Sequence, residues 1–180
     1  GIVFGQKGET KVTIELTPIK PDSIWVADYG EVFFAKPGKD NKYLLHFKHD
    51  KPLKVRMGFE KPEKRSMTLY LEQGGQLNIV SDFDKHSSFS GKDAENTRVF
   101  NECSRVYASA YQKKGEEIGD KILSPEDAVK TYYDLGQLKL NVLEANRQKV
   151  SKTFYDDCYI SFSCEKLSMP IMLPKYYVTP

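Results

Sequence analysis

The chain has few of the residues and none of the short motifs that commonly mark an active site. Its 180 residues include only 3 cysteines, 3 histidines and 1 tryptophan, and no two cysteines form a Cys-x-x-Cys pair. It also lacks a Gly-x-Gly-x-x-Gly loop, a Walker-type lysine loop, a Gly-x-Ser-x-Gly turn and a His-Glu-x-x-His motif. We therefore expect a non-catalytic chain with no catalytic residue, no cofactor and no metal site.

Long apolar runs and a strong net charge are missing as well. No stretch has the length of apolar sequence that crosses a membrane. The 27 Lys and Arg nearly balance the 25 Asp and Glu, and the net charge of +2 argues against a nucleic-acid partner. What is present, 39% hydrophobic and 12% aromatic residues, predicts a folded, sheet-rich globule. The opening Gly1-Ile2-Val3-Phe4 without Met favours a chain trimmed of a targeting segment, hence an exported protein.

The front half alternates apolar and polar residues, as half-buried strands do. In the segment Lys11 to Leu16 every second residue is apolar, and turn residues bound each later segment. We expect strands over residues 11–16, 23–29, 31–35, 43–48, 53–59, 67–72 and 76–80. The glycines of Gln73-Gly74-Gly75 predict a tight hairpin between the last two. Residues 1–91 are therefore predicted to form an antiparallel, β-sandwich-like region.

After Gly91 the apolar period changes to that of a helix. Val99, Cys103 and Val106 recur at spacings of three and four, which predicts a helix over residues 94–113. Ser124 followed by Pro125 predicts the cap and first position of a second helix. Residues 92–153 should thus form a helical hairpin, and residues 154–180 an irregular but packed tail. The fold class is α+β within one structural domain.

The three cysteines carry no sign of redox chemistry. Cys103 falls on the apolar face of the first helix, where core packing is expected. Cys158 and Cys164 have five residues between them and on an extended strand would lie about 20 Å apart, beyond disulfide range. A turn between them would permit a structural disulfide, and this pair is the one disulfide candidate. The alternative is that both are buried free thiols.

Other chemistry-bearing residues have ordinary explanations. His46 and His49 point to opposite faces of a strand, so a shared metal would need a turn at Lys48. Asp82 and Asp84 are neighbouring loop acids, which rarely face each other across a cleft. The aromatic residues Trp25, Tyr29 and Phe33 would suit a stacking platform for glycan. Core packing is the alternative, and the apolar Ile24 and Val26 beside Trp25 favour a strand buried on both faces.

Two segments carry a family resemblance. Residues 69–79 (LYLEQGGQLNI) and 89–96 (FSGKDAEN) resemble the accessory domain that precedes the thioredoxin-like domain in many exported thiol-disulfide oxidoreductases of Gram-negative bacteria. The resemblance implies a β-sandwich-like front half with helices, and a redox motif that lies in the separate thioredoxin fold. The Tyr- and Pro-rich segment up to Pro180 is typical of a domain junction, so we expect a thioredoxin-like domain to follow in the parent chain.

The resemblance implies a function. The chain is expected to be a non-catalytic accessory domain of an envelope thiol-disulfide oxidoreductase in the periplasm or anchored to the outer membrane, where it positions the redox domain or its substrate. Its partners would be that thioredoxin-like domain and other envelope proteins. One alternative is a self-standing cell-surface lipoprotein domain that binds glycan or protein. Another is an enzyme whose site is assembled from distant residues.

Overall fold

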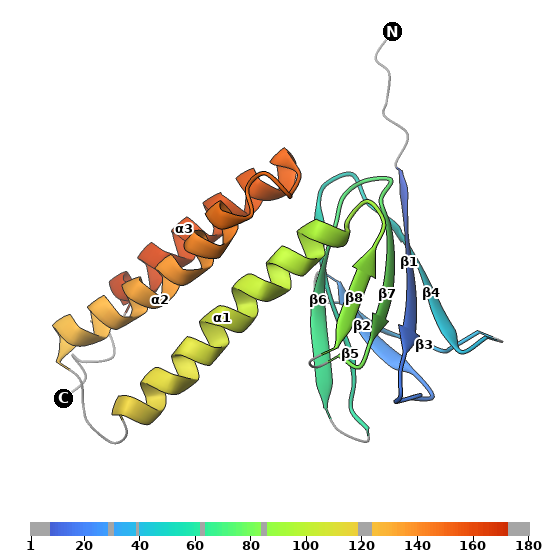
Figure 1. Ribbon diagram of the computed structural model, residues 1–180, viewed down its shortest axis with the longest axis horizontal. Helices are drawn as coiled ribbons and strands as arrows, with labels where there is room; N and C mark the ends of the chain where they lie inside the picture. The colour runs from blue at the N-terminus through green and yellow to red at the C-terminus, as the bar shows by residue number, and fades with distance from the viewer. Residues whose placement is uncertain are drawn as a thin grey trace, which may run out of the picture. The chain divides into compact units, whose positions relative to one another are not determined.

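Strands come first along the chain and helices follow, which confirms the predicted α+β class (Figure 1). The structure is a computed structural model that describes residues 8–28, 31–38, 40–61, 64–83, 86–118 and 124–172. The chain divides into two compact units, residues 1–101 and 102–180. They are called the β unit and the helical unit below.

The described residues of the β unit form eight strands in two four-stranded sheets. The first sheet has the order β4-β1-β7-β8 and the second the order β3-β2-β5-β6. The strands are β1 (Glu9–Leu16), β2 (Ile24–Asp28), β3 (Glu31–Ala35), β4 (Lys42–Lys48), β5 (Leu53–Phe59), β6 (Arg65–Leu71), β7 (Gln76–Ser81) and β8 (Ser87–Ser90). Seven of them agree with the predicted strands to within two residues. The serine-rich β8 was not predicted, because it contains a single apolar residue, Phe89.

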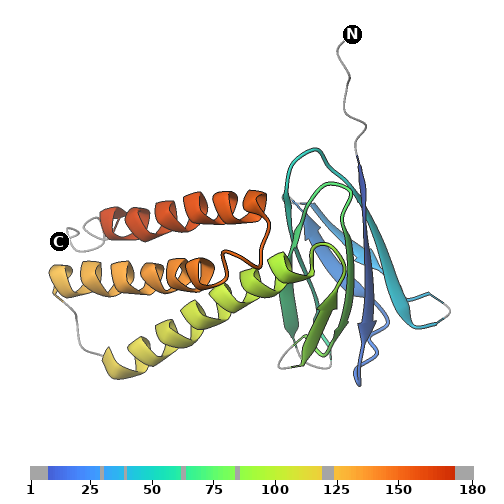
Figure 2. The same ribbon diagram turned by 45° about the horizontal axis from the view of Figure 1, so that its top comes forward.

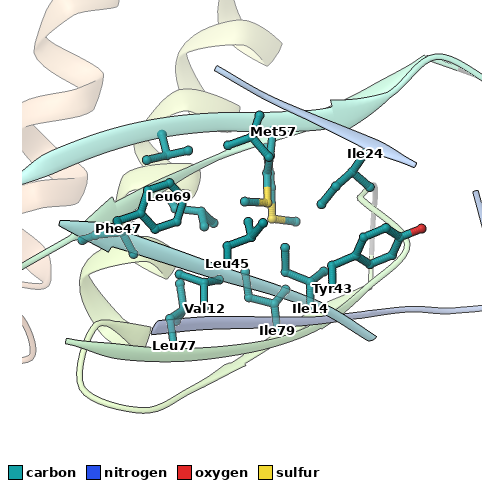
Figure 3. Close-up of a cluster of buried hydrophobic side chains, with 14 of the residues drawn as sticks. Val12, Ile14, Ile24, Tyr43, Leu45, Phe47, Met57, Leu69, Leu77 and Ile79 are labelled. Atoms are coloured by element: carbon teal, nitrogen blue, oxygen red, sulfur yellow. The ribbon is translucent and has the colours of Figure 1, made fainter. Parts of the chain in front are cut away.

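The apolar core of the β unit lies between the two sheets. Figure 3 shows Ile24, Met57 and Leu69 of the second sheet pointing toward side chains of the first. The facing residues on β1 are Val12 and Ile14, both at most 1% exposed. Since alternate residues of a strand point to opposite faces, period two in the sequence becomes one buried face per strand.

The chain path departs from a simple meander at the turn after β6. Gly74 has φ +67° and Gly75 N–H donates to Glu72 O, so the predicted tight turn is present. It is not a hairpin, however, because β6 lies in the second sheet and β7 in the first. β7 instead pairs with β1, in parallel. The prediction of a hairpin was wrong because a local turn signal does not specify which strand is the neighbour.

The helices are α1 (Ala94–Ile118), α2 (Pro125–Ala145) and α3 (Lys152–Met172), and α2 and α3 lie side by side (Figure 2). α1 begins in the β unit, to which its residues 94–101 belong, and continues into the helical unit. Ser124 caps α2 as predicted, since its hydroxyl accepts from Asp127 N–H at 3.1 Å, and Pro125 occupies the first turn.

Residues 152–172 are a helix, so the prediction of an irregular tail was wrong for this segment. Phe154, Cys158 and Phe162 recur every four residues and are each at most 3% exposed, which is the spacing of one buried helical face. Ser151 accepts from Phe154 N–H and starts the helix. Pro170 misled the prediction, because it falls in the last turn of α3. Residues 173–180 lie outside the described part.

Candidate functional site

The cysteines, the first candidates for chemistry, are separate free thiols. Cys103 on α1 is fully buried, and its Sγ–H donates to Lys139 O at 3.5 Å. Burial raises the pKa of the Cys103 thiol to about 12, with a smaller contribution from Glu102. A thiol so rarely ionised is a poor nucleophile, and its position agrees with the predicted packing role.

The candidate pair Cys158 and Cys164 is not a disulfide, since both are free and both lie on α3. Six residues along a helix amount to about 9 Å, beyond the Cα separation that a disulfide spans. Cys158 is fully buried, whereas Cys164 is exposed. The distance argument from the sequence assumed an extended strand, whereas the segment is a helix. Its conclusion that the two sulfurs are too far apart to bond still holds.

The histidines have separate partners, as the strand geometry predicted. His46 Nδ1 lies 2.9 Å from Glu9 Oε1 on the surface, and this bond lowers the pKa of Glu9. Of the two candidate loop acids, Asp82 binds His86 through both carboxylate oxygens at 3.1 Å, and Asp84 lies outside the described residues. Across the described ranges, no group of three His, Cys, Asp or Glu side chains is placed to hold a metal ion.

His49 is the centre of a buried polar cluster that sequence reasoning missed. Its Nδ1 lies 2.6 Å from Lys51 O and its Nε2 lies 2.8 Å from Thr10 Oγ1. Thr10 in turn donates its only hydroxyl hydrogen to Glu72 O at 2.8 Å. The three hydrogen bonds connect the segment after β4 to β1 and to the residue after β6.

Asp93 lies in the same region, directly before α1. It is fully buried, and neither carboxylate oxygen has a hydrogen bond of normal geometry. Burial raises its pKa to about 6, and the charge of Glu72 adds to this; the Glu72 backbone N–H, Lys92 and His49 act in the opposite direction. A Cβ on Gly75 would lie 1.8 Å from Asp93 Oδ2, so only glycine leaves room for the carboxylate. We call Thr10, His49, Glu72 and Asp93 the polar cluster.

The polar cluster joins segments that are far apart in sequence and lies largely below the surface. Asn96 of α1 reinforces it by donating to Glu72 Oε1 at 3.1 Å. His49 is 9% exposed and Thr10 and Asp93 are fully buried, so these groups are shielded from solvent. Their effect is to tie the ends of β1, β4 and β6 to the start of α1.

The most unusual surface of the β unit is the edge strand β3. Its central residues are all apolar and all exposed: Val32 by 60%, Phe33 by 43% and Phe34 by 70%. β2 pairs with one side of β3 without a bulge, and no described strand pairs with the other side. We call residues 31–35 the β3 edge.

The other three edge strands are protected in ways that β3 is not. β4 alternates Leu44 with charged or ionisable residues such as Lys42 and His46. β8 is short and rich in serine. On β6, the first turns of α1 cover Tyr70, whose backbone N–H donates to Thr97 Oγ1 at 3.1 Å. Natural sheets use these devices to prevent strands from pairing with other chains, so an unprotected apolar edge indicates a contact surface.

The three aromatic residues of the predicted platform are not brought together as expected. Trp25 lies directly opposite Phe34, which the sequence did not single out, and Phe33 points to the other face of the sheet, opposite Val26. Gly58 is the next neighbour of Trp25, and a Cβ there would lie 2.8 Å from the indole ring. The guanidinium of Arg56 lies 5.8 Å from the ring centroid. Tyr29 lies outside the described residues.

The helical unit has a groove of about 370 Å³ between α2 and α3. Lys166 lines it and donates to Gln137 Oε1 at 2.5 Å while its Nζ lies 3.9 Å from the centroid of the Tyr133 ring. On the opposite wall, Glu144 Oε2 accepts from Tyr155 O–H at 2.5 Å, a bond that raises the pKa of Tyr155. These charged groups are held by structural partners within the helix pair.

Comparisons with known proteins give no relative for this chain. No family model, no curated protein and no solved structure matches it. Within the described residues, no helix is both long and apolar enough to cross a membrane. The site must therefore be interpreted from its own geometry, and the observation that stands out is the β3 edge.

Proposed function

We propose that this chain is a non-catalytic interaction module, and that the β3 edge is its contact surface. The observation that carries the proposal is the run of three exposed apolar residues, Val32 to Phe34, on an edge strand with no charge, proline or bulge in its interior. Exposed apolar residues scattered singly are common, but a consecutive run on an unpaired backbone edge favours strand addition by another polypeptide.

The resemblance at residues 69–79 and 89–96 supports the proposal that this module belongs to an exported thiol-disulfide oxidoreductase. In this proposal the module holds the redox domain or presents a protein substrate to it, within the cell envelope. The chain's own thiols support a non-catalytic role, since Cys103 is buried with a pKa near 12 and the exposed Cys164 lies on a different helix. Thiol-disulfide exchange needs an ionised attacking thiol and a second thiol within reach to resolve the mixed disulfide.

The proposal is tested in the intact parental protein with the substitution Phe34→Lys. A module that presents protein substrates makes the variant slower at reducing a disulfide-bonded protein such as insulin, while reduction of a small aromatic disulfide is unchanged. Leu44→Lys is the matched control, because Leu44 is 64% exposed and lies on the edge strand of the other sheet. It should leave both rates unchanged.

Two results would contradict the proposal. One is an equal loss of rate with the protein and the small disulfide, which would indicate damage to the redox domain. The other is turnover by the isolated chain that disappears in Cys164→Ser, which would make the chain itself the catalyst. A parental protein without a Cys-x-x-Cys domain would refute the oxidoreductase assignment while leaving the interaction surface to be tested.

A second candidate function is glycan binding at the outer face of β2 and β3. The observation that favours it is the directly opposed pair Trp25 and Phe34, two aromatic rings on one partly exposed face with Arg56 beside them. Trp25 is the chain's single tryptophan, so its fluorescence reports on this face alone. Titration with oligosaccharides should shift that fluorescence in the wild type and not in Phe34→Lys if glycan binds here.

A further inference from the structure

We infer that the β3 edge pairs with the β3 edge of a second copy of the chain, in antiparallel orientation about a two-fold axis. The two four-stranded sheets β3-β2-β5-β6 then join into one continuous sheet. The inference rests on the proposed role of the β3 edge as a contact surface, and it adds the identity of the partner.

Charge favours a second copy in this orientation. The strand begins at the acid Glu31 and is followed by the base Lys36, and both side chains are exposed. Antiparallel pairing of two copies places the Glu31 end of each strand beside the Lys36 end of the other, so the like charges lie at opposite ends of the interface. Parallel pairing would place like charges together, which is unfavourable across neighbouring strands.

Symmetry and the apolar pattern then select the register. Two residues directly opposite each other in a sheet point to the same face, and a two-fold axis between the strands keeps each residue on its own face. Residues on one face of a strand are an even number of positions apart. The symmetric pairing must therefore be centred on one residue, which lies opposite its own copy. If that residue is Phe33, Val32 faces Phe34 and Glu31 faces Ala35, so every large apolar side chain meets another.

The neighbouring registers are less favourable. Centring the axis on Val32 sets Glu31 opposite Phe33, and centring it on Phe34 sets Lys36 opposite Val32. Either shift places a charged side chain against a large apolar one and exposes part of the apolar run. In the register centred on Phe33, Phe34 lies opposite Trp25 within each copy and opposite Val32 of the other copy. These side chains form one apolar strip that crosses the two-fold axis on the outer face of the joined sheet.

The first experiment measures the oligomeric state of the chain by sedimentation velocity over a wide range of concentrations. The wild type is expected to pass from monomer to dimer as concentration rises, with a matching shift in Trp25 fluorescence. Phe34→Lys brings a lysine into the apolar strip of both copies and should raise the dissociation constant at least about tenfold. The matched control Leu44→Lys, on the other sheet's edge strand, should dimerise as the wild type does. Circular dichroism and urea unfolding establish that both variants are folded.

The second experiment tests the register in a Cys164→Ser background, which removes the exposed thiol. Phe33→Cys should form a disulfide between copies on mild oxidation, because position 33 faces its own copy. Leu44→Cys should not.

A wild type that remains monomeric at every concentration would overturn the inference, as would equal crosslinking of Phe33→Cys and Leu44→Cys. These outcomes are separate from those of the proposed function. If the chain is monomeric and Phe34→Lys still slows reduction of a protein disulfide, the β3 edge is a contact surface and only the second copy is wrong as its partner. A dimeric chain whose protein-substrate turnover is unaffected by Phe34→Lys supports the self-pairing and contradicts substrate presentation.

Discussion

The β unit and the helical unit keep their polar groups in different places. The β unit buries Thr10, His49 and Asp93 at the end of an apolar core shared by both sheets. The helical unit keeps its charges on the surface, in pairs such as Lys130 with Asp134 and Lys152 with Asp156 one turn apart on a helix. Buried polar groups have large energetic consequences and surface pairs small ones, so the two units should respond very differently to substitution.

Their apolar interiors also differ in origin. Buried core residues of the β unit come from six of its described strands and from α1, and they are brought together by pairing between segments distant in sequence. In α3 the buried residues Phe154, Cys158 and Phe162 follow one another at helical spacing. Four predictions, in order of expected effect, test whether this contrast is correct.

The largest effect is expected from truncating a side chain in the core that the two sheets share. Leu69→Ala removes most of a fully buried side chain from β6 and should lower the free energy of unfolding by about 2 to 5 kcal/mol. Leu44→Ala is the matched control, because Leu44 is 64% exposed, and it should cost about 0.5 kcal/mol or less. Urea unfolding followed by Trp25 fluorescence measures both. Equal losses would mean that the two sheets do not enclose the core described here.

The next effect concerns the buried carboxyl. Burial raises the pKa of Asp93 from 3.8 to about 6, so between these pH values the folded protein holds a proton that the unfolded chain has released. The free energy of unfolding therefore falls as pH rises through this window. Asp93→Asn removes the titration and should stabilise the protein by about 1 to 3 kcal/mol at neutral pH, with little difference near pH 3.5.

Urea unfolding at a series of pH values measures this difference. Gly75→Ala gives a structural check, since its methyl group would collide with Asp93 Oδ2 and should destabilise the wild type more than the shorter Asp93→Ala background. Identical pH profiles for the wild type and Asp93→Asn would show that the carboxyl ionises as an exposed aspartate does.

A smaller effect is expected from Cys103 in α1. Cys103→Ala leaves a small cavity beside Lys139 and should cost about 1 to 2 kcal/mol. The exposed Cys164 is the control, and Cys164→Ala should be close to neutral. Because burial raises the pKa of the Cys103 thiol to about 12, a maleimide should label Cys164 first and Cys103 only after opening of the structure. Rapid labelling of native Cys103 would contradict its packing role.

The smallest effect is expected from the ion pair between Lys139 and Glu165, whose Nζ and Oε2 atoms lie 2.5 Å apart. The Glu165 side chain is 50% exposed and the Lys139 side chain 16% exposed, so solvent reaches the pair from the Glu165 side, and Glu165→Gln should cost about 0.5 to 1 kcal/mol. The difference from the wild type should disappear in 1 M NaCl, where the Debye length is about 3 Å. A loss above about 2 kcal/mol that persists in salt would show that the helical unit depends on buried electrostatics as well.

Local elements were largely predictable from the sequence, because each depends on near neighbours. The period-two pattern of Lys11 to Leu16 and the Ser124-Pro125 cap gave the correct strand and the correct helix start. The missed elements were those with an ambiguous local signal. β8 has only Phe89 as an apolar residue, and Pro170 obscured the four-residue spacing of Phe154, Cys158 and Phe162.

The surface and the polar cluster were not predictable in the same way. Nothing near Phe34 in the sequence shows that β3 is an edge strand, since that depends on β5 taking the other side of β2. Likewise, Thr10, His49 and Asp93 meet only because strand pairing aligns the ends of β1, β4 and β6. The functional residues singled out in advance, Trp25, Tyr29 and Phe33, were chosen by residue type, and residue type does not specify which face is exposed.

The sequence by itself determined the α+β class, the positions of β1 to β7, the starts of α1 and α2 and the absence of a Cys-x-x-Cys pair, because periodicity, caps and motifs are properties of short segments. Only the tertiary structure decided that the Gln73-Gly74-Gly75 turn passes between sheets, that Asp93 is buried beside Gly75, and that the β3 edge is left unprotected. The physical reason is that strand pairing joins distant segments by backbone hydrogen bonds, which every residue except proline offers alike. Which strands pair with each other therefore depends on how the whole core is buried.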